Sequence, residues 1–544
     1  MHPQPAFFRY SLLMLFMLSV TYLSMAQQPN EPMATGKFEP TWQSLQQYKA
    51  PEWFRNAKFG IWAHWGPQCQ PEQGDWYARS MYIEGSAQYK WQVQHNGHPS
   101  EFGFKDVIHQ WKAENWNPEA LVKFYKKAGA RYFFAMGNHH DNFDMWDSKY
   151  QPWNSVNIGP QKNIIDGWAK AARKNGLYFG VSIHAAHAWS WYETAQRGDK
   201  EGDKAGVPYD GKLTKADGKG KWWDGLDPQD LYAQNHALSA SSDKSNSIHG
   251  QWEWGNGASV PSVAYCNKFY DRTVDLINKY NPDLIYFDDT ALPLWPVSDA
   301  GLRIAAHYYN HNMQQHNGKL EGVIFGKVLT DEQKQCMTWD VERGSPDKIQ
   351  PLPWQTCTCI GDWHYKRSIY ENDKYKTAKT VVCMLADIVS KNGNLLLNIP
   401  VRGDGTIDDK EMKVVEEVGK WMAVNSDGIY DTRPWKIFGE GPTAENANPI
   451  KAQGFNEGKT TYSSKDIRFT TKNGVLYAIV LGWPEEGKVV IKSLSVNNPL
   501  HPAKVKQVEL LGSGKVKFSV DNNGLTVSLP VKKSSDMAFV LKIK

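Results

Sequence analysis

The sequence predicts a (β/α)8-like TIM barrel followed by a C-terminal antiparallel β-sandwich. Short apolar runs alternate with helical patterns from residue 58 to residue 422, which is typical of βα units around a parallel sheet. After about residue 430 only short alternating runs follow, with hairpin-type turns at Asn473-Gly474 and Asn523-Gly524. Because 544 residues are too many for one core, we expect a barrel domain over 27–435 and a sandwich over 436–544.

Residues 1–26 have the composition of a signal peptide. Arg9 supplies positive charge, residues 10–23 are largely apolar, and Ser24-Met25-Ala26 is a small-x-small cleavage site. The apolar run is too short for a membrane span, and no later stretch approaches the required length. We expect an exported protein, periplasmic or extracellular, with no membrane span. The oligomeric state is left open.

The composition narrows the class of partner. The net charge is only +4 and no long basic run occurs, so we do not expect nucleic acid binding. The 24 Trp and 25 Tyr residues offer flat faces of the kind that stack on sugar rings, which favours a carbohydrate partner. Six cysteines are too sparse for a disulfide framework, so we expect mostly buried free thiols.

Helix signals define the outer layer of the predicted barrel. The clearest helix covers 117–129, where Asn117 can cap the start, Pro118 suits the first turn and Gly129 can close the end. Five more helices are predicted at residues 164–174, 263–280, 301–314, 378–390 and 409–422.

Buried strands are predicted from short runs rich in β-favouring apolar residues. Seven fall in the barrel, at residues 58–65, 131–136, 177–184, 283–288, 323–325, 338–341 and 394–400. Five fall in the sandwich, at residues 475–481, 488–494, 505–511, 525–529 and 537–543. The segment 198–223, rich in Gly, Lys and Asp, is predicted to be a long insertion loop.

Polar side chains follow five of the predicted barrel strands. They are His64, residues 138–141, His184 with His187, Asp288 with Asp289, and Asp340 with Glu342. The carboxyl ends of parallel barrel strands meet at one mouth, so these side chains should converge there. A single polar residue at a strand end is more often structural, but five such groups together indicate a functional site.

The carboxylates suggest the chemistry. Glycoside hydrolysis needs two carboxyl groups that flank the bond, and Asp288 and Glu342 come from different strand ends as this requires. The alternative is that Asp288 caps the next helix or pairs with a base. A serine hydrolase elbow, a Walker A motif and a dinucleotide-binding glycine motif are not found in the sequence.

The run His139-His140-Asp141 could suggest a metal site. Adjacent residues on an extended backbone point in opposite directions, and no H-E-x-x-H spacing occurs, so we do not expect a metal. Two histidines that hydrogen-bond to sugar hydroxyls are the favoured interpretation. The structural alternative is a histidine packed against Trp146.

Several long blocks in one order resemble the α-L-fucosidases of glycoside hydrolase family 29, over about Trp53 to Trp435. The blocks are WFRNAKFGIWAHWG at 53–66, GDWYARSMY at 74–82, GNHHDNFDMWDSKYQPWNSVN at 137–157, DLIYFDD at 283–289, PWQTCTCIGDWHY at 353–365, SKNGNLLLNIPVRGDGTI at 390–407 and GIYDTRPW at 428–435. The resemblance implies a (β/α)8-like barrel with a β-sandwich, in agreement with the independent pattern.

The resemblance also implies site residues. Asp288 is at the position of the family's nucleophile, with its neighbour Asp289 as second candidate. Glu342 looks like the acid/base, with Glu332 and Glu321 as alternatives. The implied sugar-binding residues are His64, Trp76, His139 and His140.

Two positions depart from the family pattern. Asp75 replaces the glutamate that commonly precedes the Trp-Tyr pair, and a tyrosine-containing motif is replaced by the run that ends in His184. Both lie in or near the expected sugar pocket, so they bear on the identity of the sugar more than on the reaction.

The resemblance implies an exo-acting, retaining α-L-fucosidase that needs no metal or organic cofactor and acts on an oligosaccharide or polysaccharide. One alternative is an α-L-galactosidase of the same family, acting on polysaccharide that contains L-galactose, such as sulfated algal material. The alternative from another class is a non-catalytic carbohydrate-binding protein.

Overall fold

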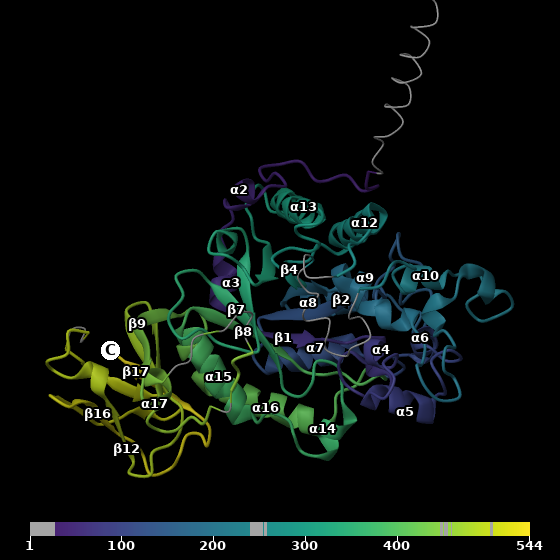
Figure 1. Cartoon of the computed structure of the whole chain (residues 1–544). Coiled ribbons are helices and arrows are strands. Elements are labelled where there is room, and N and C mark those ends of the chain that lie inside the picture. Colours follow the sequence, from purple (N-terminus) through teal and green to yellow (C-terminus); the bar gives the residue numbers. More distant parts are fainter. Residues whose placement is uncertain are drawn as a thin grey trace, which may run out of the picture.

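A computed structural model describes residues 28–239, 254, 258–446, 450, 455–458, 460–500 and 504–544 (Figure 1). The predicted signal peptide lies outside these residues. Two parts lie side by side: a barrel built from the first three quarters of the chain, and a smaller β-domain at the C-terminus. Within the residues that the structure describes, no helix combines the length and apolarity needed to cross a membrane.

Eight parallel strands close the barrel in chain order. They are β1 (Phe59–Ala63), β2 (Tyr132–Asn138), β3 (Tyr178–Ile183), β4 (Leu284–Thr290), β5 (Val323–Lys327), β6 (Thr338–Glu342), β7 (Trp354–Cys359) and β8 (Gly393–Asn398). Seven of them confirm predicted strands. The eighth, β7, is missed from sequence because its polar residues hide a strand that is buried on both faces.

Six long helices cover the barrel, and each confirms a predicted helix. They are α7 (Pro118–Lys127), α8 (Ile164–Lys174), α12 (Val263–Tyr280), α13 (Ala300–Gln315), α15 (Ala378–Ser390) and α16 (Asp409–Asn425). Asn117 accepts a hydrogen bond from the Ala120 amide and thereby caps α7, as its position in the sequence predicts.

The barrel wall is thinner around β6. Between β5 and β6 the helical structure is limited to the 3-10 turn η6 (Gln333–Gln335), and residues 343–353 connect β6 to β7 without a helix. The segment 455–458, which follows the barrel in sequence, lies against this region: its Phe455 amide donates to the Glu342 carbonyl over 2.8 Å. A later part of the chain therefore supports the strand that carries Glu342.

Successive side chains on a strand point to opposite faces of the sheet, so every second side chain of each barrel strand lies in the barrel interior. Trp62, Phe134, Tyr286 and Phe325 belong to one buried cluster inside the barrel. The inward positions two residues further along β4 and β5 are Asp288 and Lys327, at the carboxyl ends of the strands. Residues two apart on a strand share a face, which explains why the polar residues at the mouth lie directly above an aromatic layer.

The C-terminal domain consists of two antiparallel sheets with a shared apolar core, which confirms the predicted sandwich. The larger sheet has the order β14-β13-β17-β11-β10-β9 and the smaller one β12-β16-β15. Their strands are β9 (Arg433–Glu440), β10 (Ile467–Lys472), β11 (Val475–Val480), β12 (Lys488–Ile491), β13 (Val508–Leu510), β14 (Gly514–Lys515), β15 (Phe518–Asp521), β16 (Gly524–Ser528) and β17 (Phe539–Ile543). The boundary predicted after residue 435 falls inside β9.

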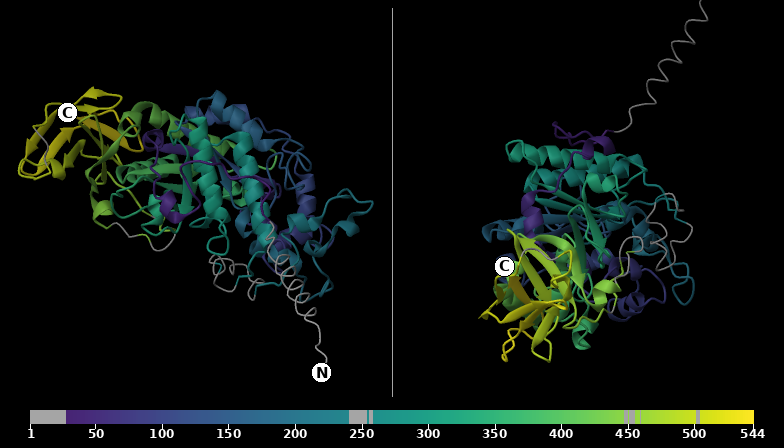
Figure 2. Two further views of the ribbon diagram at one scale, coloured as in Figure 1. Left: turned by 90° about the horizontal axis from the view of Figure 1, so that it is seen from above. Right: turned by 90° about the vertical axis from the view of Figure 1, so that its left-hand side faces the viewer.

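The sandwich contacts the barrel through α15, which lies beside β9 and β10 (Figures 1 and 2). At this junction the buried Asp387 of α15 accepts from Arg468 of β10 over 2.6 Å and from Lys391 over 2.7 Å. Burial alone would raise the pKa of Asp387, but the two cations outweigh it and lower the pKa to about 2. The junction is therefore held by a buried charge cluster.

We expect Asp387→Asn to lower the free energy of unfolding by about 3 kcal/mol, because two buried cations lose their carboxylate. The pKa of Asp387 in the folded protein lies below its unfolded value of 3.8, so its contribution to the free energy of unfolding is fully present above pH 3.8. It is lost as the pH falls toward about 2. Urea denaturation at pH 7 and pH 3 measures both effects, and equal stability of the two proteins at pH 7 would contradict the role.

The insertion 198–223 packs against residues of the barrel domain. Asp210 accepts from the hydroxyls of Tyr82 and Tyr232 at 2.6 and 2.5 Å, and it pairs with Lys105 at 3.1 Å. Asp199 accepts from His98 over 2.9 Å. The predicted loop is therefore anchored at two buried carboxylates. All six cysteines are free and buried, as predicted.

Candidate active site

The barrel mouth brings together most of the side chains that the sequence singles out. Asp288 follows Tyr286 on β4, Glu342 ends β6, and His184 follows β3 directly. All three lie at the carboxyl ends of their strands, and two of them contact one another: His184 Nδ1 lies 3.1 Å from Asp288 Oδ2. The ends of β3 and β4, two of the five strand ends singled out in the sequence, therefore meet at the mouth.

Asp288 is the most heavily contacted carboxylate of the mouth. His140 Nε2 and His184 Nδ1 each lie 3.1 Å from its Oδ2, and Lys327 Nζ contacts Oδ1. Burial raises its pKa, but Lys327 and the two histidines prevail and hold the pKa well below its usual range. Its side chain remains 17% exposed. Asp288 is thus an ionised, accessible carboxylate, as a nucleophile must be.

His140 links Asp288 to the backbone that follows β3. Nδ1 lies 2.7 Å from the carbonyl oxygen of His184, and Nε2 faces Asp288. His140 thereby fixes the orientation of the Asp288 carboxylate.

Lys327 is the principal site residue that the sequence interpretation misses. It ends β5, its side chain is 5% exposed, and its Nζ contacts both Asp288 Oδ1 and Glu342 Oε2. Glu342 is 14% exposed. A signal was available: Lys327 lies two residues after Phe325, hence on the inward face of a strand at the barrel mouth.

The alternative carboxylates lie elsewhere. Asp289 has the opposite orientation to Asp288 and is 2% exposed, with His187 Nε2 at 2.9 Å from its Oδ1. Glu321 precedes β5 and therefore lies at the amino end of the barrel, where it pairs with Lys319. Glu332 is exposed next to η6. Only Glu342 among these glutamates shares a cation with Asp288.

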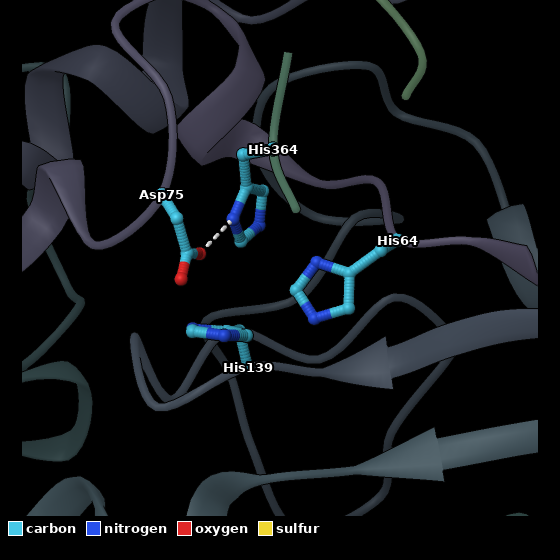
Figure 3. A group of neighbouring side chains, drawn as sticks. All are labelled: His64, Asp75, His139 and His364. Carbon is cyan, nitrogen blue, oxygen red and sulfur yellow. Dashed lines mark hydrogen bonds and ion pairs between the residues drawn. The ribbon is translucent and has the colours of Figure 1, made fainter. Parts of the chain in front are cut away.

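A second cluster consists of His64, Asp75, His139 and His364 (Figure 3). Asp75 and His364 approach from one side, with His364 Nδ1 2.6 Å from Asp75 Oδ1, while His64 and His139 complete a common space between the four side chains. The rings of His64 and His364 are 4.5 Å apart, and those of His139 and His184 4.9 Å. His364, which the sequence interpretation also misses, provides the partner of Asp75.

The four side chains could also hold a metal ion by distance alone, since one donor atom from each lies within 4.8 Å of the others. The hydrogen bonds disfavour this at His139. Gln68 Nε2 lies 2.8 Å from His139 Nδ1 and 3.1 Å from Asp141 Oδ2, while Gln68 Oε1 accepts from the Ala78 amide. The Gln68 side-chain NH2 group therefore donates to His139 Nδ1, and the ring proton of His139 is on its Nε2. A protonated nitrogen donates hydrogen bonds and does not ligate a metal.

Burial keeps His64, His139 and the neighbouring His184 neutral. It lowers the pKa of His64 and His139 well below the usual range and, despite Asp288, that of His184 to about 4. Within the described part of the chain, His64 Nδ1, His184 Nε2 and His364 Nε2 are buried and unpaired. An unpaired buried polar atom costs about 1–3 kcal/mol, so this cluster is suited to a hydroxyl-rich ligand.

Trp76 lies at the edge of this cluster. It adopts a left-handed backbone conformation with φ 58°, which is rare for a bulky residue and typical of functional sites. Its ring meets Trp191 edge to face at 6.2 Å, and Trp191 in turn lies 5.7 Å from the ring of His140. Trp76 is thus connected to the site through Trp191.

We expect Asp75→Asn to lower kcat/KM by about 10–100-fold, since the pair with His364 and one charged acceptor for a ligand hydroxyl are lost. The effect should fall mainly on KM, because Asp75 pairs with His364 and has no role in the bond-breaking steps assigned to Asp288 and Glu342. Steady-state kinetics with an aryl glycoside measures this. An unchanged kcat/KM would exclude Asp75 from the pocket.

Comparisons with known proteins give the family to which the chain is similar. A family model described as alpha-L-fucosidase matches residues 25–427, and one described as alpha-L-fucosidase C-terminal domain matches residues 460–544. The chain is 25% identical to human tissue alpha-L-fucosidase over 97% of its own length and 94% of that protein. It is also 25% identical to an alpha-L-fucosidase of Branchiostoma floridae, over 97% and 99% of the two chains.

The fold matches that of a solved structure. The alpha-fucosidase of Thermotoga maritima superposes with a TM-score of 0.65 at 24% identity, over 93% of this chain and all of that one. This likeness extends over the barrel and the sandwich together.

Proposed function

This chain belongs to the α-L-fucosidase family of glycosidases, and from this premise we propose that it is an exo-acting, retaining enzyme that releases terminal α-L-fucose from glycans. The observation that carries the proposal is the contact of one ammonium group, that of Lys327, with both Asp288 and Glu342. It pairs two carboxyl groups from different strands at the mouth of the barrel.

The shared ammonium limits the distance between the two carboxyl groups. Two charge-assisted hydrogen bonds of ordinary length end to end span about 5.6 Å, so the nearest oxygens of Asp288 and Glu342 are no farther apart than this. Retaining glycosidases separate their carboxyl groups by about 5–5.5 Å and inverting ones by about 6.5–9.5 Å. The spacing supports a retaining mechanism.

In this mechanism Asp288 attacks the anomeric carbon while Glu342 protonates the leaving oxygen. The bond to the aglycone breaks and a glycosyl ester forms on Asp288. Glu342, now a carboxylate, takes a proton from water, whose oxygen attacks the anomeric carbon and releases Asp288. The hydrogen bonds from His140 and His184 present one Asp288 oxygen in a fixed orientation throughout.

The remaining cluster fits the hydroxyls of one sugar. His139 Nε2 is a donor, Asp75 is an acceptor, and the bond from His364 Nδ1 to Asp75 leaves His364 Nε2 as an acceptor. His139 and His364 are buried and Asp75 is only 21% exposed, so these groups suit a single terminal sugar. This supports the exo-acting mode.

A second candidate is α-L-galactoside hydrolysis at the same site. L-galactose differs from L-fucose by a hydroxyl on C6, and the buried, unpaired His364 Nε2 is one atom that could bind an additional hydroxyl. A pocket that accepts the methyl group discriminates against the hydroxyl by about 100-fold or less, so few residues decide between the sugars.

Release of the aryl group from aryl α-L-fucoside and aryl α-L-galactoside, measured side by side, tests the proposal. Faster fucoside cleavage supports it, and a galactoside preference would move the substrate while keeping the mechanism. If folded protein cleaves neither these nor a fucosylated oligosaccharide, the proposal fails and the non-catalytic carbohydrate-binding alternative stands.

We also propose where in or outside the cell the enzyme acts. The signal-peptide pattern of residues 1–26 supports export to the periplasm or the outside of the cell. Detection of the mature protein in the exported fraction, with an N-terminus at Gln27, is the expected result.

A further inference from the structure

Lys327 reaches two groups whose charges alternate in the proposed reaction. In the free enzyme Asp288 is a carboxylate and Glu342 carries the acidic proton. After the first step Asp288 is a neutral ester and Glu342 a carboxylate, and the second step reverses both changes. One negative charge is therefore present in each state, and it moves from one carboxyl group to the other.

We propose that Lys327 is a positioning residue that serves as counter-ion to Asp288 in the first half-reaction and to Glu342 in the second. The inference rests on the proposed retaining mechanism. His140 and His184 each lie 3.1 Å from Asp288, whereas Lys327 Nζ contacts both Asp288 and Glu342. The ammonium therefore has a partner of opposite charge in each state, without a movement of the backbone.

The second partner of Lys327 matters because the ammonium group is buried. The Lys327 side chain is 5% exposed and its Nζ lies 5.6 Å from the centroid of the Tyr286 ring, so bulk water solvates the ammonium poorly if it loses a partner. A charge that remains buried without a partner is strongly destabilising. If Lys327 reached only Asp288, formation of the glycosyl ester would leave the ammonium unpaired.

The groups that face Lys327 keep it charged. Burial lowers its pKa, but Asp288 and then Glu342 outweigh burial and raise the pKa well above the usual range. Burial raises the pKa of Asp340, deeper on the inward face of β6, to about 7. Lys327 therefore stays an ammonium while the surrounding acids titrate.

The test compares Lys327→Met, Lys327→Arg and Lys327→Gln with the full-length protein. We expect Lys327→Met and Lys327→Gln to lower kcat on an aryl α-L-fucoside by about 100–1,000-fold. The pH optimum should move upward, because loss of a nearby cation favours the protonated form of carboxyl groups. The kcat of Lys327→Arg should be at least tenfold higher than that of Lys327→Met and Lys327→Gln. Lys334→Met, a surface lysine that pairs with exposed Asp331, is the matched control and should remain at wild-type activity.

A slow substrate, 2-deoxy-2-fluoro-fucosyl fluoride, separates the two half-reactions. We expect Lys327→Gln to slow both formation of the glycosyl-enzyme and its hydrolysis, each by tenfold or more. An effect on one step alone, or an unchanged pH optimum with reduced activity, would overturn the shared role. If Lys327→Met does not fold, the Gln and Arg variants still decide.

Failure of the proposed function gives a different result. In that case the wild-type protein itself forms no glycosyl-enzyme and hydrolyses no fucoside, which would overturn both proposals. Normal wild-type turnover together with a fully active Lys327→Gln variant would overturn the role of Lys327 alone.

Discussion

Asp288→Ala is expected to lower the rate of aryl α-L-fucoside hydrolysis by about 10,000-fold or more. Without the carboxylate no glycosyl ester can form, and removal of a nucleophile from a two-step mechanism has effects of this size. Binding should persist, because the cluster of Asp75, His64, His139 and His364 remains in place. Steady-state kinetics and calorimetric titration with L-fucose measure the two properties.

Asp289→Asn is the matched control for this change. It alters the adjacent carboxylate, which is buried against His187 and does not contact Lys327. We expect its activity to stay within tenfold of wild type. If Asp289→Asn loses activity as strongly as Asp288→Ala while both proteins remain folded, the assignment of the nucleophile is wrong. External azide should restore turnover in Asp288→Ala and form a β-fucosyl azide.

Glu342→Ala is expected to lower kcat/KM for substrates with poor leaving groups by about 100–10,000-fold, because the leaving oxygen loses its proton donor. Substrates with a strongly acidic leaving group need no protonation, so their first step should change much less. Their glycosyl-enzyme should then accumulate, because the second step lacks its base. A series of aryl fucosides, followed by burst kinetics, measures this contrast.

The control for Glu342 is Glu332→Ala, which removes an exposed carboxylate of the loop between β5 and β6. Its kinetics should match wild type. Azide should accelerate the second step in Glu342→Ala and give α-fucosyl azide, the product of retained configuration. A uniform loss for all leaving groups would contradict the acid/base role and reopen the question of which residue acts.

The sequence determined the architecture because helix caps, strand composition and turn chemistry act locally. Asn117 and Pro118 mark a helix start wherever that helix packs, and a run such as Leu284–Phe287 is apolar enough to require burial. Among the barrel strands the exception is β7, whose polar residues face partners that come from other strands. Gln355, for example, donates to Asp340 of β6 over 2.9 Å.

The position of the mouth was also predictable, since parallel strands place their last residues at one end. Asp288, Glu342 and the histidines could be named for that reason, aided by the resemblance to a family. The period of two along a strand further separates Asp288 from Asp289 once the inward face is known. Lys327 satisfies the same rule and could have been found by it.

Only the tertiary structure decided which side chains share a proton or a charge. The pair of Asp75 and His364 joins residues 289 positions apart, and the contact of Lys327 with both carboxyl groups joins three strands. Such contacts depend on barrel closure and on the relative heights of strand ends, which no local pattern encodes. The sequence alone specified the groups at the barrel mouth, whereas the folded barrel decided which of them touch.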